Sequence, residues 1–114
     1  MVNYNFQNHV KGDTFNGVLF TVTVNDVAFD LTGATITMDV RPTKTGSVVA
    51  TYSTTTTGIT ISSPSTAGKF TFDEQIIDIA AAKYVYDIEI ELSSGTVKTY
   101  IWGNWEITQD VTYD

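Results

Sequence analysis

Hydrophobic and polar residues alternate with a period of two along most of the chain. In residues 20–24, Phe20, Val22 and Val24 alternate with threonines, so one side of the segment is apolar and the other is polar. The same pattern recurs in residues 36–40, 59–61, 70–72, 86–92 and 105–107. It predicts half-buried β-strands, and the many threonines favour strands because a β-branched side chain suits a pleated sheet.

Turn-forming residues separate these segments. They occur at positions 25–26, 32–33, 44–47, 64–68, 93–95 and 103–104. They divide the chain into about seven to nine short strands, and regularly spaced short strands predict an all-β, antiparallel β-sandwich. One segment differs, because residues 73–82 begin with acidic residues and end in alanines. We expect at most one short helical turn there, near residues 74–80.

A tyrosine, Tyr84, stands just before the strongly alternating segment of residues 86–92. This placement is typical of the tyrosine corner of immunoglobulin-like domains, in which the tyrosine hydroxyl ties a loop to the sheet. The chain has no cysteine, so the disulfide of antibody domains is absent and stability must come from packing. The likeness is therefore to the immunoglobulin-like architecture alone.

Length and charge limit the classes of function. A chain of 114 residues with 42% hydrophobic residues is the size of a single domain, here residues 1–114. The first residues do not form a secretory signal, and we expect a soluble protein made in the cytoplasm. The net charge is −7 and the six basic residues are dispersed, so we expect neither nucleic acid nor a membrane as partner.

The residues that catalysis or metal binding needs do not form a recognisable set. His9 is the single histidine, and no serine or cysteine nucleophile stands in a known motif. Asp87, Glu89 and Glu91 recur with a period of two and should project from one side of a strand. A solvated outer face explains this row better than a cation site, because calcium loops gather their ligands from a curved segment. We expect no enzyme, no metal and no cofactor.

Aromatic residues gather near the C-terminus and supply the first interface candidates. The cluster consists of Tyr100, Trp102, Trp105 and Tyr113. If residues 96–102 form a strand, Val97, Thr99 and Ile101 lie on one face and Lys98, Tyr100 and Trp102 on the other. Packing in the core is the alternative for these rings, but Tyr100 and Trp102 are the pair that we expect outside it.

The N-terminal residues supply the second candidates. In residues 1–10, Tyr4 and Phe6 alternate with polar residues. A short terminal segment of this kind can add a strand to the sheet of a neighbour, so we predict an N-terminal docking strand with Tyr4 and Phe6 as interface residues. Deleting residues 1–9 is then expected to abolish assembly and to leave a folded monomer.

Six short motifs suggest a family. They are Gly12-Asp13-Thr14-Phe15, the segment Asp-Leu-Thr-Gly-Ala-Thr-Ile at 30–36, Val40-Arg41-Pro42, Gly68-Lys69-Phe70, Tyr84-Val85-Tyr86-Asp87-Ile88 and Gly95-Thr96-Val97. Over nearly its whole length the chain resembles small immunoglobulin-like structural proteins of tailed bacteriophages, and is similar to the N-terminal domain of phage baseplate upper proteins.

The resemblance implies a non-enzymatic virion structural protein at the tail, baseplate, neck or capsid surface. It would act by assembly with other phage structural proteins and with copies of itself. Baseplate upper proteins continue into a long scaffold, whereas this sequence ends at Asp114. An accessory role, as a head-fibre, decoration or connector subunit, is therefore equally open. The resemblance supplies no catalytic residues.

The alternative function is a carbohydrate-binding or adhesin-like module. Aromatic rings on a strand surface can form a flat platform for sugars, and Tyr100, Trp102 and Trp105 are the candidates. This alternative predicts glycan affinity that is lost on Trp102→Ala.

Overall fold

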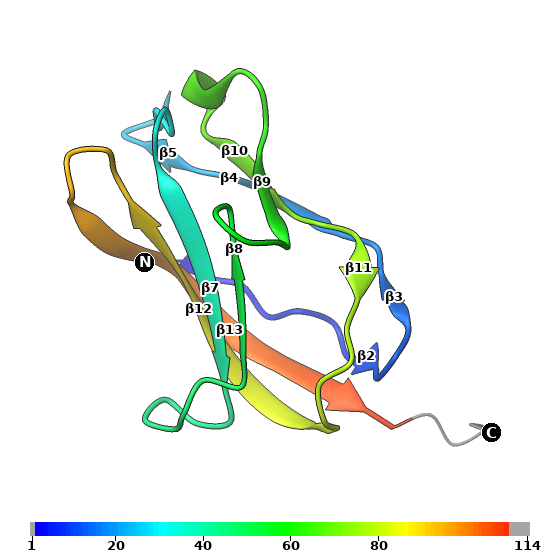
Figure 1. Ribbon diagram of the computed structural model, residues 1–114. Helices are drawn as coiled ribbons and strands as arrows, with labels where there is room; N and C mark the ends of the chain where they lie inside the picture. Colours follow the sequence, from blue (N-terminus) through cyan, green and yellow to red (C-terminus); the bar gives the residue numbers. More distant parts are fainter. Residues whose placement is uncertain (1, 110–114) are drawn as a thin grey trace.

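The computed structural model describes residues 2–109 and shows two facing β-sheets (Figure 1). The larger sheet has the strand order β1-β13-β12-β7-β8: β1 (Val2–Asn3), β13 (Val97–Thr108), β12 (Ala82–Glu91), β7 (Thr35–Arg41) and β8 (Ala50–Ser53), with β2 (His9–Val10) also on β13. The smaller sheet has the order β4-β10-β9: β4 (Val18–Thr21), β10 (Lys69–Phe72) and β9 (Ile59–Ile61). Two short strand pairs complete the fold: β3 (Thr14–Phe15) with β11 (Gln75–Ile76), and β5 (Thr23–Val24) with β6 (Val27–Ala28).

This strand order is that of an immunoglobulin-like sandwich. The order β4-β10-β9 corresponds to strands B-E-D of that fold, and β13-β12-β7-β8 corresponds to G-F-C-C′. Seven strands of the described part are three residues or longer, within the predicted range, and six more have two residues each. The prediction of an all-β, immunoglobulin-like sandwich is confirmed.

The core lies between the sheets and follows the alternation in the sequence. The buried side chains of the two central strands are Ile36, Met38 and Val40 on β7 and Tyr84, Tyr86, Ile88 and Ile90 on β12. A group of aromatic rings fills the end of the core beside β2 and β3: Phe6, Phe15, Phe72, Tyr86 and Trp105. Apolar residues at every second position therefore meet across the sandwich, as the pattern predicts.

The predicted tyrosine corner is present. The hydroxyl of Tyr84 donates a hydrogen bond of 2.6 Å to the backbone carbonyl of Ala80, four residues upstream. The bond ties the loop before β12 to the start of that strand. Tyr84 is otherwise buried, so the hydroxyl also gains the partner that a buried phenol needs.

The short helical turn allowed for near residues 74–80 does not form. Gln75 and Ile76 form β11, which pairs with β3, and the next residue, Ile77, is fully buried. Strand pairing and the burial of Ile77 outweigh a weak helical propensity. Within residues 2–109 the helical turn that does occur is a 3₁₀ turn, η1 (Ser65–Ala67). No helix in that range is long and apolar enough to cross a membrane.

The turn expected at residues 103–104 is also wrong, because β13 runs without interruption from Val97 to Thr108. Gly103 is needed there for a close approach of two backbones. A Cβ atom at this position would overlap the Tyr4 carbonyl, lying 2.7 Å from its carbon atom. The glycine thus marks the place where the N-terminal segment crosses β13.

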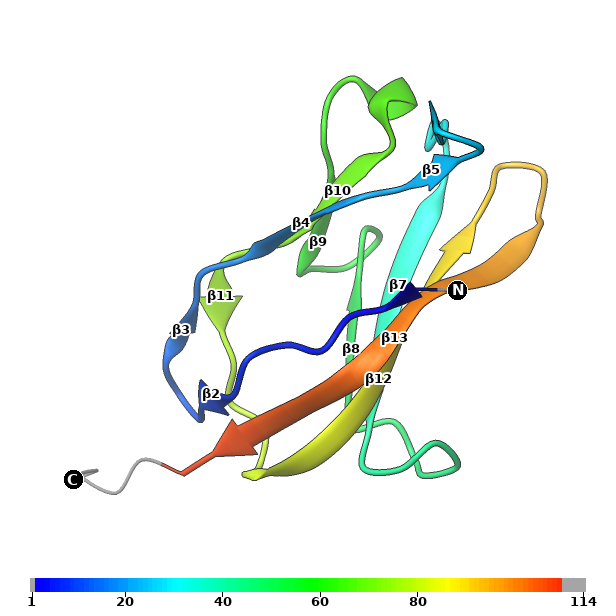
Figure 2. The ribbon, with the colours of Figure 1, turned by 180° about the vertical axis from the view of Figure 1, so that it is seen from behind.

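The N-terminal segment lies along the edge of β13 in its own domain, in parallel orientation (Figure 2). The backbone N–H of Tyr4 donates to the Trp102 carbonyl at 2.9 Å, and that of Phe6 donates to the Asn104 carbonyl at 3.1 Å. The expected free docking strand is therefore already paired. The prediction that Phe6 is an interface residue was wrong, because Phe6 is 6% exposed and packs in the core.

Candidate functional site

A β-bulge in β13 separates the two aromatic residues that were expected to lie together. Ile101 pairs with Ile88 and Thr99 with Glu89, so the intervening Tyr100 has no partner on β12. One extra residue reverses the alternation on its far side. The Tyr100 ring therefore packs against Phe29, with 5.5 Å between centroids, whereas Trp102 points to the outer face of the larger sheet.

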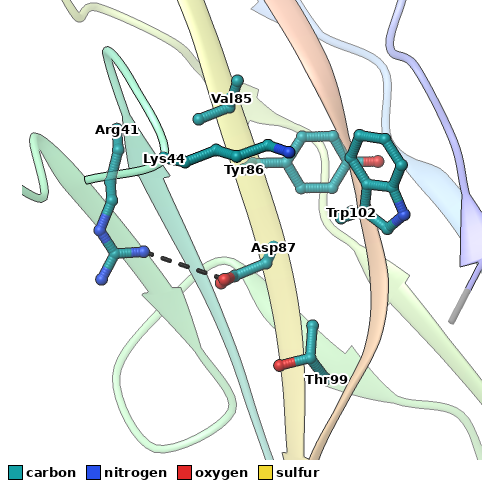
Figure 3. Close-up of a pocket in the computed structure, with 7 residues that line it drawn as sticks. All are labelled: Arg41, Lys44, Val85, Tyr86, Asp87, Thr99 and Trp102. Atoms are coloured by element: carbon teal, nitrogen blue, oxygen red, sulfur yellow. Dashed lines mark ion pairs between the residues drawn. The ribbon is translucent and has the colours of Figure 1, made fainter. Parts of the chain in front are cut away.

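Trp102 forms one wall of a hollow on that outer face (Figure 3). The hollow has a volume of about 310 Å³. Its lining consists of Arg41, Lys44, Val85, Tyr86, Asp87, Thr99 and Trp102, and we call it the outer hollow. Trp102 lies directly opposite Asp87 of β12. The Lys44 ammonium, from the loop after β7, lies 5.5 Å from the centroid of the Trp102 ring. That distance allows a cation–π interaction.

The charges in and beside the outer hollow compensate one another. The Arg41 guanidinium lies 3.9 Å from the Asp87 carboxylate and 3.8 Å from that of Asp39. Partial burial raises the pKa of Asp87, Arg41 opposes that shift, and Asp39 adds to it. With two cations and two carboxylates nearby, the hollow favours an uncharged ligand that combines an apolar face with hydrogen-bonding groups over a strongly charged ligand.

The acidic row has the solvated position that the sequence indicates. Glu89 and Glu91 are exposed on the outer face of β12, in line with the half-buried Asp87. His9 of β2 is half-buried, and its Nε2 atom lies 2.9 Å from the Asp13 carbonyl. Among residues 2–109, no three histidine, cysteine, aspartate or glutamate side chains are grouped as metal ligands.

The two tyrosines predicted as interface residues, Tyr4 and Tyr100, meet in a second hollow, between the two sheets. Its lining consists of Val2, Tyr4, Phe20, Thr21, Val22, Thr23, Tyr100 and Ile101. We call it the edge groove, because it lies between β1 and the edge of β4. The Tyr4 ring packs edge-on against Phe20, with 5.5 Å between centroids, and Tyr4 is 39% exposed. The sequence indicated both tyrosines but gave no reason to place them together.

The other aromatic candidates do not join a surface platform. Trp105 is 1% exposed and packs in the core, where its indole N–H has no hydrogen-bond partner in the part of the chain described. Tyr113 lies outside the described residues. Arg41, Lys44 and Thr99, which surround Trp102, were not among the sequence candidates. The Val-Arg-Pro motif at 40–42 was a signal for Arg41, whereas nothing in the sequence places Lys44 above an indole ring.

Comparisons with known proteins add a distant structural likeness. No family model matches the chain, and no curated protein matches its sequence. CopC from Methylosinus trichosporium OB3b is similar in structure, with 12% sequence identity and a TM-score of 0.49, over 94% of this chain and 89% of CopC. At that distance the likeness carries no argument about function, and the immunoglobulin-like assignment depends on the strand order described above.

Proposed function

We propose that the chain is a non-enzymatic structural protein of a tailed-phage virion, at the tail, baseplate, neck or capsid surface. It acts by binding other structural proteins and further copies of itself. The proposal depends on the family resemblance, and the observation that carries it is where the resembling motifs lie.

Three of those motifs come together at the centre of the larger sheet. Residues 30–36 form the turn before β7 and its start, residues 40–42 end β7, and residues 84–88 lie on β12, which pairs with β7 over its length. Asp30 holds the turn, since its carboxylate accepts hydrogen bonds from the Thr32 hydroxyl at 2.6 Å and the Thr32 backbone N–H at 2.9 Å. These bonds lower the pKa of Asp30. Motifs distant in sequence thus form one structural unit, which supports a common origin over a chance match of separate short segments.

Exposed apolar side chains give the domain surfaces for protein contacts. The largest exposures among them are Val27 and Ile76 at 66%, Val2 at 62% and Leu19 at 56%. They lie on four different strands, so several sides of the domain can each meet a partner. A subunit that has several neighbours in a particle needs such a distribution.

The test is the solution mass of the purified protein, measured by light scattering at several concentrations. The same measurement is then made with the products of the neighbouring genes added. We expect a defined oligomer or a mixed complex of fixed stoichiometry. A protein that stays monomeric at every concentration and binds none of those products would count against the proposal.

Glycan binding is the second candidate, and the outer hollow favours it. An aromatic ring beside a hydroxyl and charged hydrogen-bonding groups, here Trp102, Thr99, Asp87 and Arg41, is a common arrangement in sugar sites. The platform is smaller than the sequence suggested, because Trp105 is buried and Tyr100 lies on the other side of the sheet.

If a glycan array identifies a ligand, Trp102→Ala should weaken its binding by about tenfold or more, because the ring would supply the stacking surface. Tyr100→Ala is the matched control and should leave the affinity unchanged, since Tyr100 does not line the outer hollow. Equal losses in the two variants, or no bound glycan at all, would rule this candidate out. Isothermal titration calorimetry gives both affinities.

A further inference from the structure

The strand β4 forms an edge of the smaller sheet. It pairs with β10 on one side, and within residues 2–109 no strand pairs with its other side. Figure 2 shows β4 along the rim of the molecule. The edge groove, with Val2, Tyr4 and Tyr100, lies next to this free side. An edge strand presents unpaired backbone groups, so the question is what pairs with them.

The register with β10 identifies the free groups. The N–H of Val22 donates to the carbonyl of Gly68, the residue directly opposite, so this is a hydrogen-bonded pair. Hydrogen-bonded and non-hydrogen-bonded pairs alternate along an antiparallel ladder. Phe20 and Val18 therefore bond to β10, whereas the backbone N–H and C=O groups of Leu19 and Thr21 point away from it. Each copy of the chain thus offers two donors and two acceptors along this edge.

The edge lacks the features that normally prevent strand addition. From Asn16 to Asn25 the chain has no charged residue and no proline, and residues 18–24 are Val-Leu-Phe-Thr-Val-Thr-Val. Proteins protect exposed edges with lysine, proline, bulges or very short strands. Leu19 is also 56% exposed on the outer side of the strand, next to Thr21, which is exposed as well.

The remaining edges of the two main sheets are less open to pairing than β4. At the far side of the sandwich, Ser53 and Gly58 form an isolated bridge that brings the ends of β8 and β9 together. On the N-terminal side, the segment on β13 is broken into the two-residue strands β1 and β2, and most of its exposed side chains are polar: Asn3, Asn5, Gln7 and Asn8, beside the exposed Val2 and Tyr4. Apart from the two-residue strands, β4 is the edge of the described structure whose free side has neither a paired segment nor a bridge.

We propose that β4 is a self-association site, at which it pairs antiparallel with β4 of a second copy of this chain about a two-fold axis at Phe20. In this register Leu19 lies opposite Thr21 of the second copy, and Thr21 lies opposite Leu19 of the second copy. Each of the two pairs makes two backbone hydrogen bonds, so every free group of both edges finds a partner. The smaller sheets of the two copies become one continuous sheet.

The second copy is the occupant that the edge fits best. The hydrogen-bonding groups are self-complementary in this one register, and the side chains in contact are uncharged, so no charge is buried. Each copy carries a net charge of −7, which acts against association at long range. Added salt screens that repulsion over about 10 Å at 0.1 M and should therefore strengthen the dimer. The proposal names a specific partner for the assembly role proposed above, namely a second copy of the chain. Its biological setting rests on that proposed function, whereas its geometry does not.

The first experiment measures the dimer and its dependence on the edge, by analytical ultracentrifugation of the full chain at concentrations up to about 1 mM. The wild type should show a monomer–dimer equilibrium that tightens as salt increases. Leu19→Lys places an ammonium on the edge of each copy and should raise the dimer dissociation constant at least about tenfold. Ile76→Lys is the matched control, since Ile76 is an equally apolar and even more exposed residue on β11, and it should leave the constant unchanged.

The second experiment tests the register and uses the absence of cysteines from the chain. Directly opposite residues of a hydrogen-bonded antiparallel pair have Cα atoms about 5.5 Å apart, which a disulfide spans. A mixture of the Leu19→Cys and Thr21→Cys variants should form a disulfide-linked dimer under mild oxidation. Each variant alone should form much less, because its two copies of the substituted residue lie more than about 8 Å apart. Leu19→Cys mixed with Thr60→Cys, on the outer face of β9, is the control for random collision.

The results separate this proposal from the proposed function. A wild type that stays monomeric at all concentrations, a dimer insensitive to Leu19→Lys, or equal crosslinking in both mixtures would overturn β4 pairing. If such a protein still binds the product of a neighbouring gene, the assembly role stands without it. A dimer with the predicted crosslink supports β4 pairing even where no neighbouring product binds.

Discussion

Phe6→Ala should lower the free energy of unfolding by about 3–5 kcal/mol, a large part of the 5–15 kcal/mol typical of a domain. The ring is 6% exposed and contacts several others, among them Tyr86 at 4.7 Å and Trp105 at 5.0 Å between centroids. Its removal leaves a cavity in the aromatic cluster and takes away the main side-chain contact that holds the N-terminal segment on β13. Urea denaturation followed by tryptophan fluorescence measures the loss.

Tyr4→Ala is the control within the same segment. Tyr4 is 39% exposed, and we expect a smaller loss of roughly 1–2 kcal/mol. Equal losses of unfolding free energy in the two variants would show that the Phe6 side chain is not the main contact that holds the N-terminal segment on β13. The same reasoning alters the expectation for deletion of residues 1–9. That deletion removes Phe6 together with the backbone bonds to β13, so it should destabilise the fold and not leave an intact monomer.

Gly103→Ala should cost about 3 kcal/mol and release the N-terminal segment from β13. The added methyl group would occupy the position of the Tyr4 carbonyl, and it would also lie 3.0 Å from the Tyr86 ring. The Tyr4 backbone and the buried Tyr86 ring leave the methyl group little room, so the segment must move away or β13 must bend. Amide hydrogen exchange at Tyr4 and Phe6, whose N–H groups bond to β13, should accelerate strongly in the variant.

A second glycine distinguishes overlap from backbone strain. Gly95, in the turn before β13, has a φ of +94° and no atom within 4 Å of the place that a Cβ would take. Gly95→Ala should therefore cost only about 1 kcal/mol, from the unfavourable φ, and leave exchange at Tyr4 and Phe6 unchanged. If Gly103→Ala behaves in the same way, the close approach of the two backbones is not what fixes the segment.

Much of the fold could be predicted from the sequence, because burial between two sheets imposes a period of two on each strand. The alternation in residues 36–40 and 86–92 identified the two central strands, and the position of Tyr84 identified the corner. The turn at 103–104 was mistaken because a glycine followed by an asparagine is a common turn pair. In this chain the glycine serves a contact between segments about a hundred residues apart, which local pattern cannot reveal.

The candidate site was less predictable, and the bulge at Tyr100 is the reason. A bulge changes the pairing of one residue and leaves no mark in composition, yet it reverses the alternation on one side of it. Strict alternation therefore placed Tyr100 with Trp102, whereas the structure places Tyr100 with Tyr4. Phe6 was assigned to an interface because an alternating terminal segment looks alike whether it pairs with its own domain or with a neighbour.

The parallel pairing of the first and last strands also determines how the domain responds to force. Val2, where β1 begins, lies beside Ile101, and β13 ends at Thr108, so the start of β1 and the end of β13 lie at opposite ends of this pairing (Figure 2). Tension applied through the termini pulls the two strands past each other in opposite directions. The Tyr4 and Phe6 backbone bonds then share the load in shear, instead of opening one after another as in an unzipped hairpin. We therefore expect the domain to resist unfolding under tension. Single-molecule pulling from the termini should record one abrupt unfolding event at high force.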